Sequence, residues 1–117
     1  MVGEGVRLVR KIEEPVKLKV YLLEGDKVDG VPAVDWILER VRELGLRGAT
    51  VHRCFAGCGR RGRSEARILR TSMNLPVVVE VVDSREKVER LLELLKERLG
   101  VGVVTLERLE VAYDLEG

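Results

Sequence analysis

The sequence predicts a single α+β domain in which two helices cover one face of a four-stranded antiparallel sheet. The first observation is the order of the patterns along the chain, which runs strand, helix, strand, strand, helix, strand. Two βαβ units in that order form the split ferredoxin-like sandwich. The second observation is size and composition, because 117 residues, 45% of them hydrophobic, suit one domain with a sizeable core. Aromatic residues contribute only 3%, so the core is expected to consist of Val, Leu and Ile.

The first half of the chain contains a strand, a helix and a second strand. Residues 16–24 alternate between apolar and polar side chains, which is typical of a half-buried strand. Pro32 suits the first turn of a helix, because its missing N–H is not needed there. Apolar residues then recur at helical spacing over residues 34–44, and Gly45 ends the run. A second strand is expected over residues 49–55.

The second half contains a strand, a helix and a last strand. Five of the six residues 77–82 are apolar, as expected for a strand that is covered on both faces. Asp83 followed by Glu86 is typical of a capping box at the start of the second helix, whose apolar face extends to Leu99. The last strand is expected over residues 103–113. The sheet face without helices must be covered or solvated, and small proteins of this architecture usually cover it by oligomerising.

Residues 1–117 are expected to form one domain, with an N-terminal extension over residues 1–15 and a long loop over residues 57–75. That loop is too long for a hairpin connection, and loops of such length are usually functional or disordered. Six arginines and one acidic residue lie between Arg53 and Arg70, although the whole chain carries only +1. The positive charge is therefore concentrated around the loop, whereas the near-neutral total does not suggest a general nucleic-acid binder.

The composition of the chain also indicates a cellular location and a kind of source organism. No apolar run is long enough to span a membrane, and Cys54 and Cys58 cannot form the disulfide framework of a secreted domain. A reduced, cytoplasmic location is therefore expected. The chain has no Gln, one Asn and many Arg and Glu, a bias that is also found in proteins of thermophiles.

Residue types with catalytic or metal-binding chemistry are few. The single histidine cannot be placed in a Ser-His-Asp arrangement, so the protein is not expected to be an enzyme. His52, Cys54 and Cys58 would share one face of an extended strand and could bind zinc or copper. Two cysteines at this spacing match no standard site, and free cysteine is usually a small buried apolar residue, so no metal is predicted. Trp36 falls on the polar side of the first helix, where it either anchors a partner or is partly buried in its own subunit.

Four segments together resemble a known family. They are residues 45–51, the turn Gly57-Cys58-Gly59, residues 75–84 and residues 103–111. The combination covers most of residues 16–113 and resembles the PII-like "domain of unknown function 190" family. That family is similar in turn to the PII nitrogen-regulatory signal-transduction proteins.

The resemblance implies a homotrimer of ferredoxin-like subunits that binds adenine nucleotides between neighbouring subunits. The loop between the second and third strands would then report the bound ligand to a protein target, such as a membrane transporter or an enzyme. The PII positions near the nucleotide fall on Thr50, Gly57, Gly59, Gly100 and Gly102. The sequence departs from PII proteins at Val103, where they have a phosphate-contacting lysine, and at Val111 and Tyr113, where they have paired arginines.

The loop composition independently suggests phosphate binding. Its glycines let backbone N–H groups approach an anion, and Arg60 and Arg61 offer forked donors to phosphate. The alternative is a solvated loop whose arginines bind no ligand. The leading hypothesis is a signalling adaptor that binds a small anionic ligand, an adenine nucleotide, between subunits. An RNA-binding module that uses the arginine-rich loop and a metal-handling trimer of similar fold are the alternatives, although the chain lacks the aromatic platform that base stacking needs.

Overall fold

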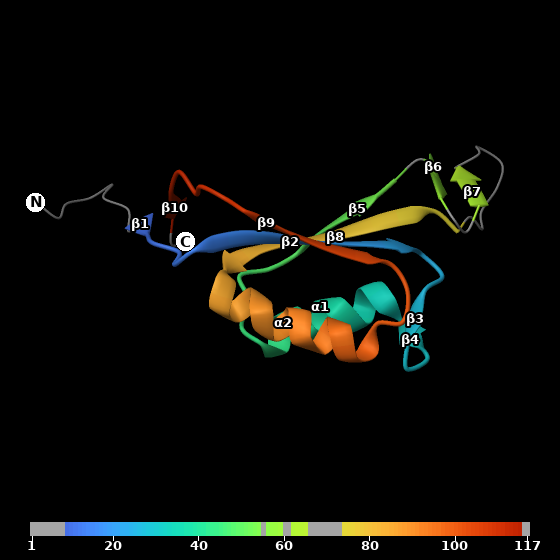
Figure 1. Ribbon diagram of the computed structural model, residues 1–117, viewed down its shortest axis with the longest axis horizontal. Helices are drawn as coiled ribbons and strands as arrows, with labels where there is room; N and C mark the ends of the chain where they lie inside the picture. Colours follow the sequence, from blue (N-terminus) through green and yellow to red (C-terminus); the bar gives the residue numbers. More distant parts are fainter. Residues whose placement is uncertain (1–8, 55, 60–61, 66–73, 116–117) are drawn as a thin grey trace, which may run out of the picture.

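The computed structural model describes residues 9–54, 56–59, 62–65 and 74–115. Within these ranges the main sheet has four antiparallel strands in the order β5-β8-β2-β9 (Figure 1). They are β2 (Pro15–Leu23), β5 (Thr50–Arg53), β8 (Pro76–Ser84) and β9 (Val103–Arg108). The predicted four-stranded antiparallel sheet is therefore confirmed, with β5 and β9 as its two edges.

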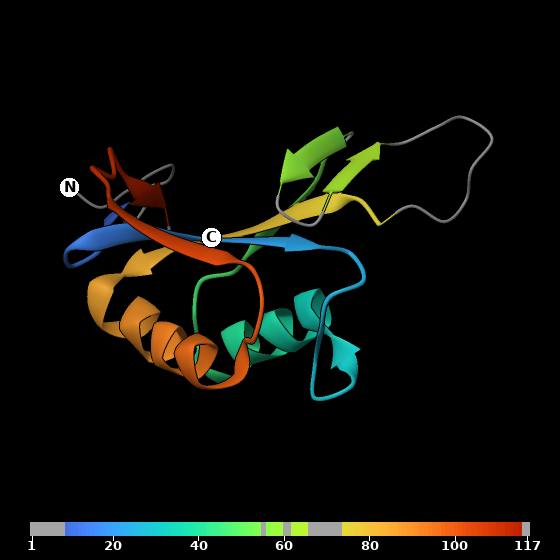
Figure 2. The ribbon, with the colours of Figure 1, turned by 45° about the vertical axis from the view of Figure 1, so that its right-hand side comes forward.

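Two helices lie against the same face of the sheet, as Figures 1 and 2 show from two directions. They are α1 (Ala33–Glu43) and α2 (Arg85–Arg98). Alternate residues of β2 and β8 point into this layer and are buried. The centre of the core is aliphatic, as the low aromatic content required, and contains Val16, Leu18, Val20, Leu22, Ile37, Val41, Val77, Val79, Val81, Val88, Leu91 and Leu95.

Three short strand pairs lie outside the main sheet within the described residues. β6 (Ala56–Gly59) and β7 (Gly62–Glu65) form a hairpin inside the segment that was expected to be only a loop. At the opposite end of the molecule, β1 (Val9–Arg10) pairs with β10 (Asp114–Leu115). Between β2 and α1, β3 (Lys27–Val28) and β4 (Val31–Pro32) form a two-residue hairpin.

One sequence prediction about a helix end, the capping box at Asp83, is wrong. The N-cap of α2 is Ser84, whose hydroxyl accepts from the N–H of Lys87 at 3.5 Å. Asp83 is instead 4% exposed and accepts from the N–H of Arg47 at 2.9 Å and of Ser84 at 2.7 Å. The buried carboxylate needs hydrogen-bond donors, and by accepting from Arg47 it cross-links the α1–β5 connection to the end of β8.

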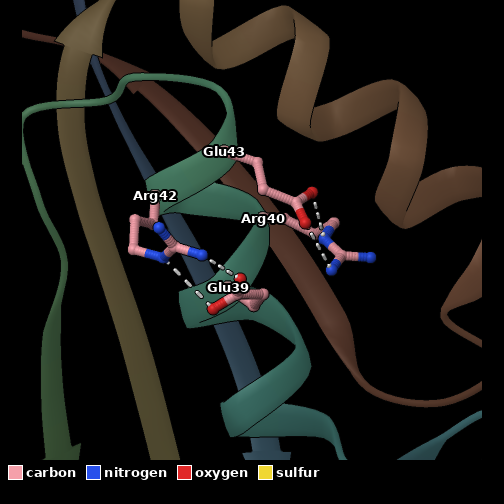
Figure 3. A network of polar contacts seen from close by, with 4 residues as sticks. All are labelled: Glu39, Arg40, Arg42 and Glu43. Atoms are coloured by element: carbon pink, nitrogen blue, oxygen red, sulfur yellow. Dashed lines mark hydrogen bonds and ion pairs between the residues drawn. The ribbon is translucent and has the colours of Figure 1, made fainter.

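Four charged residues of the first helix form two ion pairs within it. Arg40 pairs with Glu43 at 3.0 Å, and Arg42 pairs with Glu39 at 2.5 Å (Figure 3). The hydrogen bond from Arg42 lowers the pKa of the Glu39 carboxyl, which lies exposed on the helix surface. Trp36 is 8% exposed, and the Arg40 guanidinium lies 5.1 Å from the centre of its ring. Burial of Trp36 in its own subunit is therefore correct, and the residue is not an exposed partner anchor.

Candidate functional site

The turn between α2 and β9 requires glycine at one of its two glycine positions. Gly102 has φ +98°, and a Cβ there would lie 2.6 Å from the carbonyl oxygen of Tyr21 and 2.9 Å from Cδ2 of Leu22. A Cβ at Gly100 would meet no heavy atom within 4 Å. Gly102 therefore lets the backbone of the turn lie directly against β2, whereas nothing in the described residues requires glycine at position 100.

The second glycine-rich element is the β6–β7 hairpin. Gly57 pairs with Ser64, and Gly59 pairs with Gly62 across the two strands. The connection consists of Arg60 and Arg61, which lie outside the described residues, so their predicted contact with phosphate stays a prediction.

The strand register places the predicted site residues on opposite edges of the sheet. Thr50 begins β5, at one edge, and is exposed. Gly102 precedes β9, at the other edge, with β8 and β2 between them. Neighbouring strands lie about 4.8 Å apart, so the two edges are separated by roughly 14 Å. One subunit therefore does not bring the two halves of the predicted site together.

An apolar row crosses the open face of the sheet beside Gly102. Val103 lies opposite Tyr21, and Tyr21 lies opposite Val78. The exposed fractions are 60% for Val103 and 41% for Tyr21, and Val78 is half-buried. Sequence reasoning missed Tyr21 and Val103 as site candidates. The signal that could have found them was the strand over residues 77–82, whose apolar residues alternate onto both faces while the helices cover only one.

Polar residues adjoin this row on the same face. The Glu80 carboxylate lies 3.5 Å from Lys17 Nζ and 3.4 Å from His52 Nε2. Lys17 also lies 4.0 Å from Glu107 of β9. These contacts connect all four strands of the sheet, so the open face combines an apolar row with a mostly paired set of charges.

Comparison with known proteins identifies the family. A model of the family DUF190 ("Uncharacterized ACR") matches residues 15–111. The chain belongs to the DUF190 family. A UPF0166 protein of Aquifex aeolicus is 39% identical over 97 residues, which cover 82% of this chain and 91% of that protein. A UPF0166 protein of Methanocaldococcus jannaschii is 44% identical over 80 residues, or 68% of this chain and 74% of that one.

Solved structures confirm the PII-like fold of this DUF190 chain. CPII, a nitrogen regulatory PII-like protein from Thiomonas intermedia K12, superposes with a TM-score of 0.62 at 19% identity. The match covers 86% of this chain and 91% of that one, and that structure contains ADP, AMP and bicarbonate. A second structure of CPII, bound to ADP and bicarbonate, also gives a TM-score of 0.62, at 23% identity. At these identities the likeness establishes the fold of the DUF190 chain, which is the fold predicted from its sequence.

The two ends of the long central segment are anchored at one turn of the DUF190 fold. The side chain of Arg53, at the end of β5, contacts the carboxylate of Glu24, and this hydrogen bond raises the pKa of Arg53. On the returning side, Asn74 Oδ1 accepts from the N–H of Gly25 at 2.8 Å. The N–H of Glu24 donates to the carbonyl of Leu75 at 2.9 Å. The turn after β2 therefore holds the strand that enters the segment and the strand that leaves it.

The remaining chemistry-bearing residues do not assemble into a further site in the described ranges. Among those residues, no three His, Cys, Asp or Glu side chains come together as metal ligands. Cys54 is partly exposed, and the side chain of Cys58 lies outside the described residues, so the prediction on metal stays open to test. None of the helices in the described ranges has the length and apolar run that crossing a membrane requires.

Proposed function

We propose that this DUF190 protein is a PII-like regulatory adaptor that works by binding rather than by catalysis. In this proposal three copies assemble, and an adenine nucleotide binds between neighbouring copies. The long loop of residues 57–75 then presents the bound state to a protein target, such as a membrane transporter. The observation that carries the proposal is that Gly102 and Thr50 lie on opposite edges of one sheet. Each edge supplies half of a site that a second copy can complete.

The open face supports assembly of this kind. Tyr21 and Val103 expose apolar surface there, Val78 lies half-buried beside them, and Val82 lies half-buried further along the same face of β8. An assembly that removes apolar surface from water is stabilised by about 25 cal/mol per Å² of that surface. A contact that joins the β9 edge of one copy to the β5 edge of the next is heterologous, and heterologous contacts form a ring when the rotation between copies closes. A ring of three is the arrangement that the family resemblance implies.

The residues at the two edges and on the neighbouring strand β2 suit an adenine nucleotide with few phosphates. Tyr21 and Val103 offer an aromatic ring and an apolar side chain to a base, and the Thr50 hydroxyl can donate or accept a hydrogen bond. Arg60 and Arg61 would supply charge for phosphate. Val103 supplies none at the position where PII proteins have a lysine, so AMP or ADP is expected to bind at least as well as ATP. The presence of ADP and AMP in the structure of CPII supports this choice of ligand.

Calorimetry with AMP, ADP and ATP, combined with light scattering, tests the proposal. We expect the mass of a trimer of 13.2 kDa chains and micromolar binding of AMP or ADP. Loss of a base–aromatic contact costs about 1–3 kcal/mol, so Tyr21→Ala should weaken binding by roughly tenfold or more. The matched control is Val31→Ala, which truncates an exposed apolar residue of β4, away from the open face. A monomer mass at micromolar concentration, or no binding of any of the three at millimolar concentration, contradicts the proposal.

A further inference from the structure

A hollow of about 420 Å³ lies at the end of the sheet away from Gly102. It forms where the chain enters β2 and leaves β9, next to the hydrogen bond from the Leu109 N–H to the Pro15 carbonyl at 3.0 Å. Its volume falls in the range of small-molecule sites. Its apolar lining consists of Ile12, Pro15, Leu109, Val111, Ala112 and Tyr113.

Two opposite charges line the same hollow. They are the ammonium of Lys11 and the carboxylate of Glu110. Neither forms an ion pair with the other or with any residue in the described ranges, although many charges of this chain are paired. The two groups are therefore held apart at one apolar surface, where each is available to a ligand group of opposite charge.

We propose that this hollow binds a free amino acid with an apolar side chain. Lys11 binds the α-carboxylate and Glu110 binds the α-ammonium. The apolar side chain packs against Leu109, Val111 and the ring of Tyr113, which is 65% exposed without a ligand. A phosphate compound fits less well, because Glu110 repels it and the lining adds no second cation. A zwitterion matches both charges at once, and a neutral apolar molecule matches neither.

The site goes beyond the proposed nucleotide site, because within one chain the hollow and Gly102 lie at opposite ends of the sheet. Val103 beside Gly102 pairs with Tyr21, whereas Leu109 and Pro15 lie at the far ends of β9 and β2. The inference therefore does not need the nucleotide proposal, and the two can be tested on the same preparation.

Calorimetry with L-leucine and L-phenylalanine on the full chain tests the site. We expect saturable millimolar or tighter binding. Leucinamide, which lacks the carboxylate, and N-acetyl-leucine, which lacks the ammonium, should each bind about tenfold more weakly or worse, since each loses one charge-assisted contact. Lys11→Met and Glu110→Gln should each weaken L-leucine binding by a similar factor. The matched control is Lys27→Met, which removes an exposed lysine of β3 and should leave the binding of L-leucine unchanged.

Three outcomes overturn the inference. The first is no saturable binding of either amino acid at millimolar concentration. The second is binding that neither charge variant changes, although circular dichroism shows both variants folded. The third is competition between ADP and L-leucine, which would make the hollow part of the nucleotide site. Tyr21→Ala separates the two proposals, because it should weaken nucleotide binding and leave L-leucine binding unchanged.

Discussion

Replacing Gly102 by Ala tests the geometry of the α2–β9 turn most directly. The residue has φ +98°, and an L side chain in such a conformation costs of the order of 1–3 kcal/mol. The added Cβ would also lie 2.6 Å from the backbone oxygen of Tyr21, so β9 and β2 must move apart to admit it. A change of rotamer cannot relieve this overlap. We therefore expect Gly102→Ala to lower the free energy of unfolding by at least about 3 kcal/mol. That is a large fraction of the roughly 5–15 kcal/mol by which a domain is typically stable.

Urea denaturation followed by circular dichroism measures the effect, at one protomer concentration for every variant because assembly shifts apparent stability. The control is Gly100→Ala, two residues away, where an added Cβ meets open space. Surface changes of this kind usually stay within about 0.5 kcal/mol. Equal denaturation midpoints for the two variants, with equal slopes, would refute the argument that Gly102 is required by its contact with β2.

Three further predictions follow from the candidate site and the core. Val103→Lys places a cation after the glycine turn, and a charge-assisted contact of about 1.5–3 kcal/mol should strengthen ATP binding roughly tenfold. Calorimetry measures the change. The control is Val31→Lys, which adds the same charge in β4 and should leave ATP binding unchanged. Replacing Arg60 and Arg61 together by Ala should weaken ADP binding by a similar factor, and unchanged affinity would remove the arginines from the site. Asp83→Ala leaves the Arg47 N–H without its acceptor and should cost about 1–3 kcal/mol in urea denaturation; an unchanged midpoint would show that the cross-link does not stabilise the fold.

The layer architecture followed from local patterns that tertiary context did not disturb. Alternation over residues 16–24 and the helical spacing of the two apolar runs confine burial to one side of each element, so two helices on one sheet face are the natural packing. The last strand was predicted too long. It ends at Arg108, and after one further hydrogen bond, from the N–H of Leu109 to the carbonyl of Pro15, the chain turns toward β10. The alternation of apolar and polar residues does not indicate where the chain leaves the sheet.

Side chains that act across elements were harder to predict. Asp83 has the sequence context of a helix cap, yet its acceptor atoms serve a backbone N–H 36 residues away. Trp36 lies at a polar angle of α1 by periodicity, but the Arg40 side chain covers its ring. Both contacts, Asp83 with the Arg47 N–H and Arg40 with the Trp36 ring, depend on how the side chains pack. The pattern of residues along one segment does not predict such packing.

The residues of the candidate site also differ in whether the sequence alone could indicate them. Gly102 was named as a site candidate through the resemblance to PII proteins, which a glycine turn before a strand makes visible in the sequence. The row of Tyr21 and Val103 exists only through the register of three strands, so sequence reasoning could not assemble it.

Under the proposed function, the placement of the two half-sites would make ligand binding depend on assembly. If Gly102 of one copy and Thr50 of a neighbour bind the same nucleotide, the free subunit offers only half of the contacts. A ligand that binds the assembled form better than the free subunit must, by linkage, stabilise the assembly by the same factor. Nucleotide affinity should then fall as the protein is diluted below its assembly range, and nucleotide should shift that range to lower protein concentration. A complete site within one chain would show neither dependence, so dilution experiments with and without nucleotide distinguish a site shared between copies from a site within one copy.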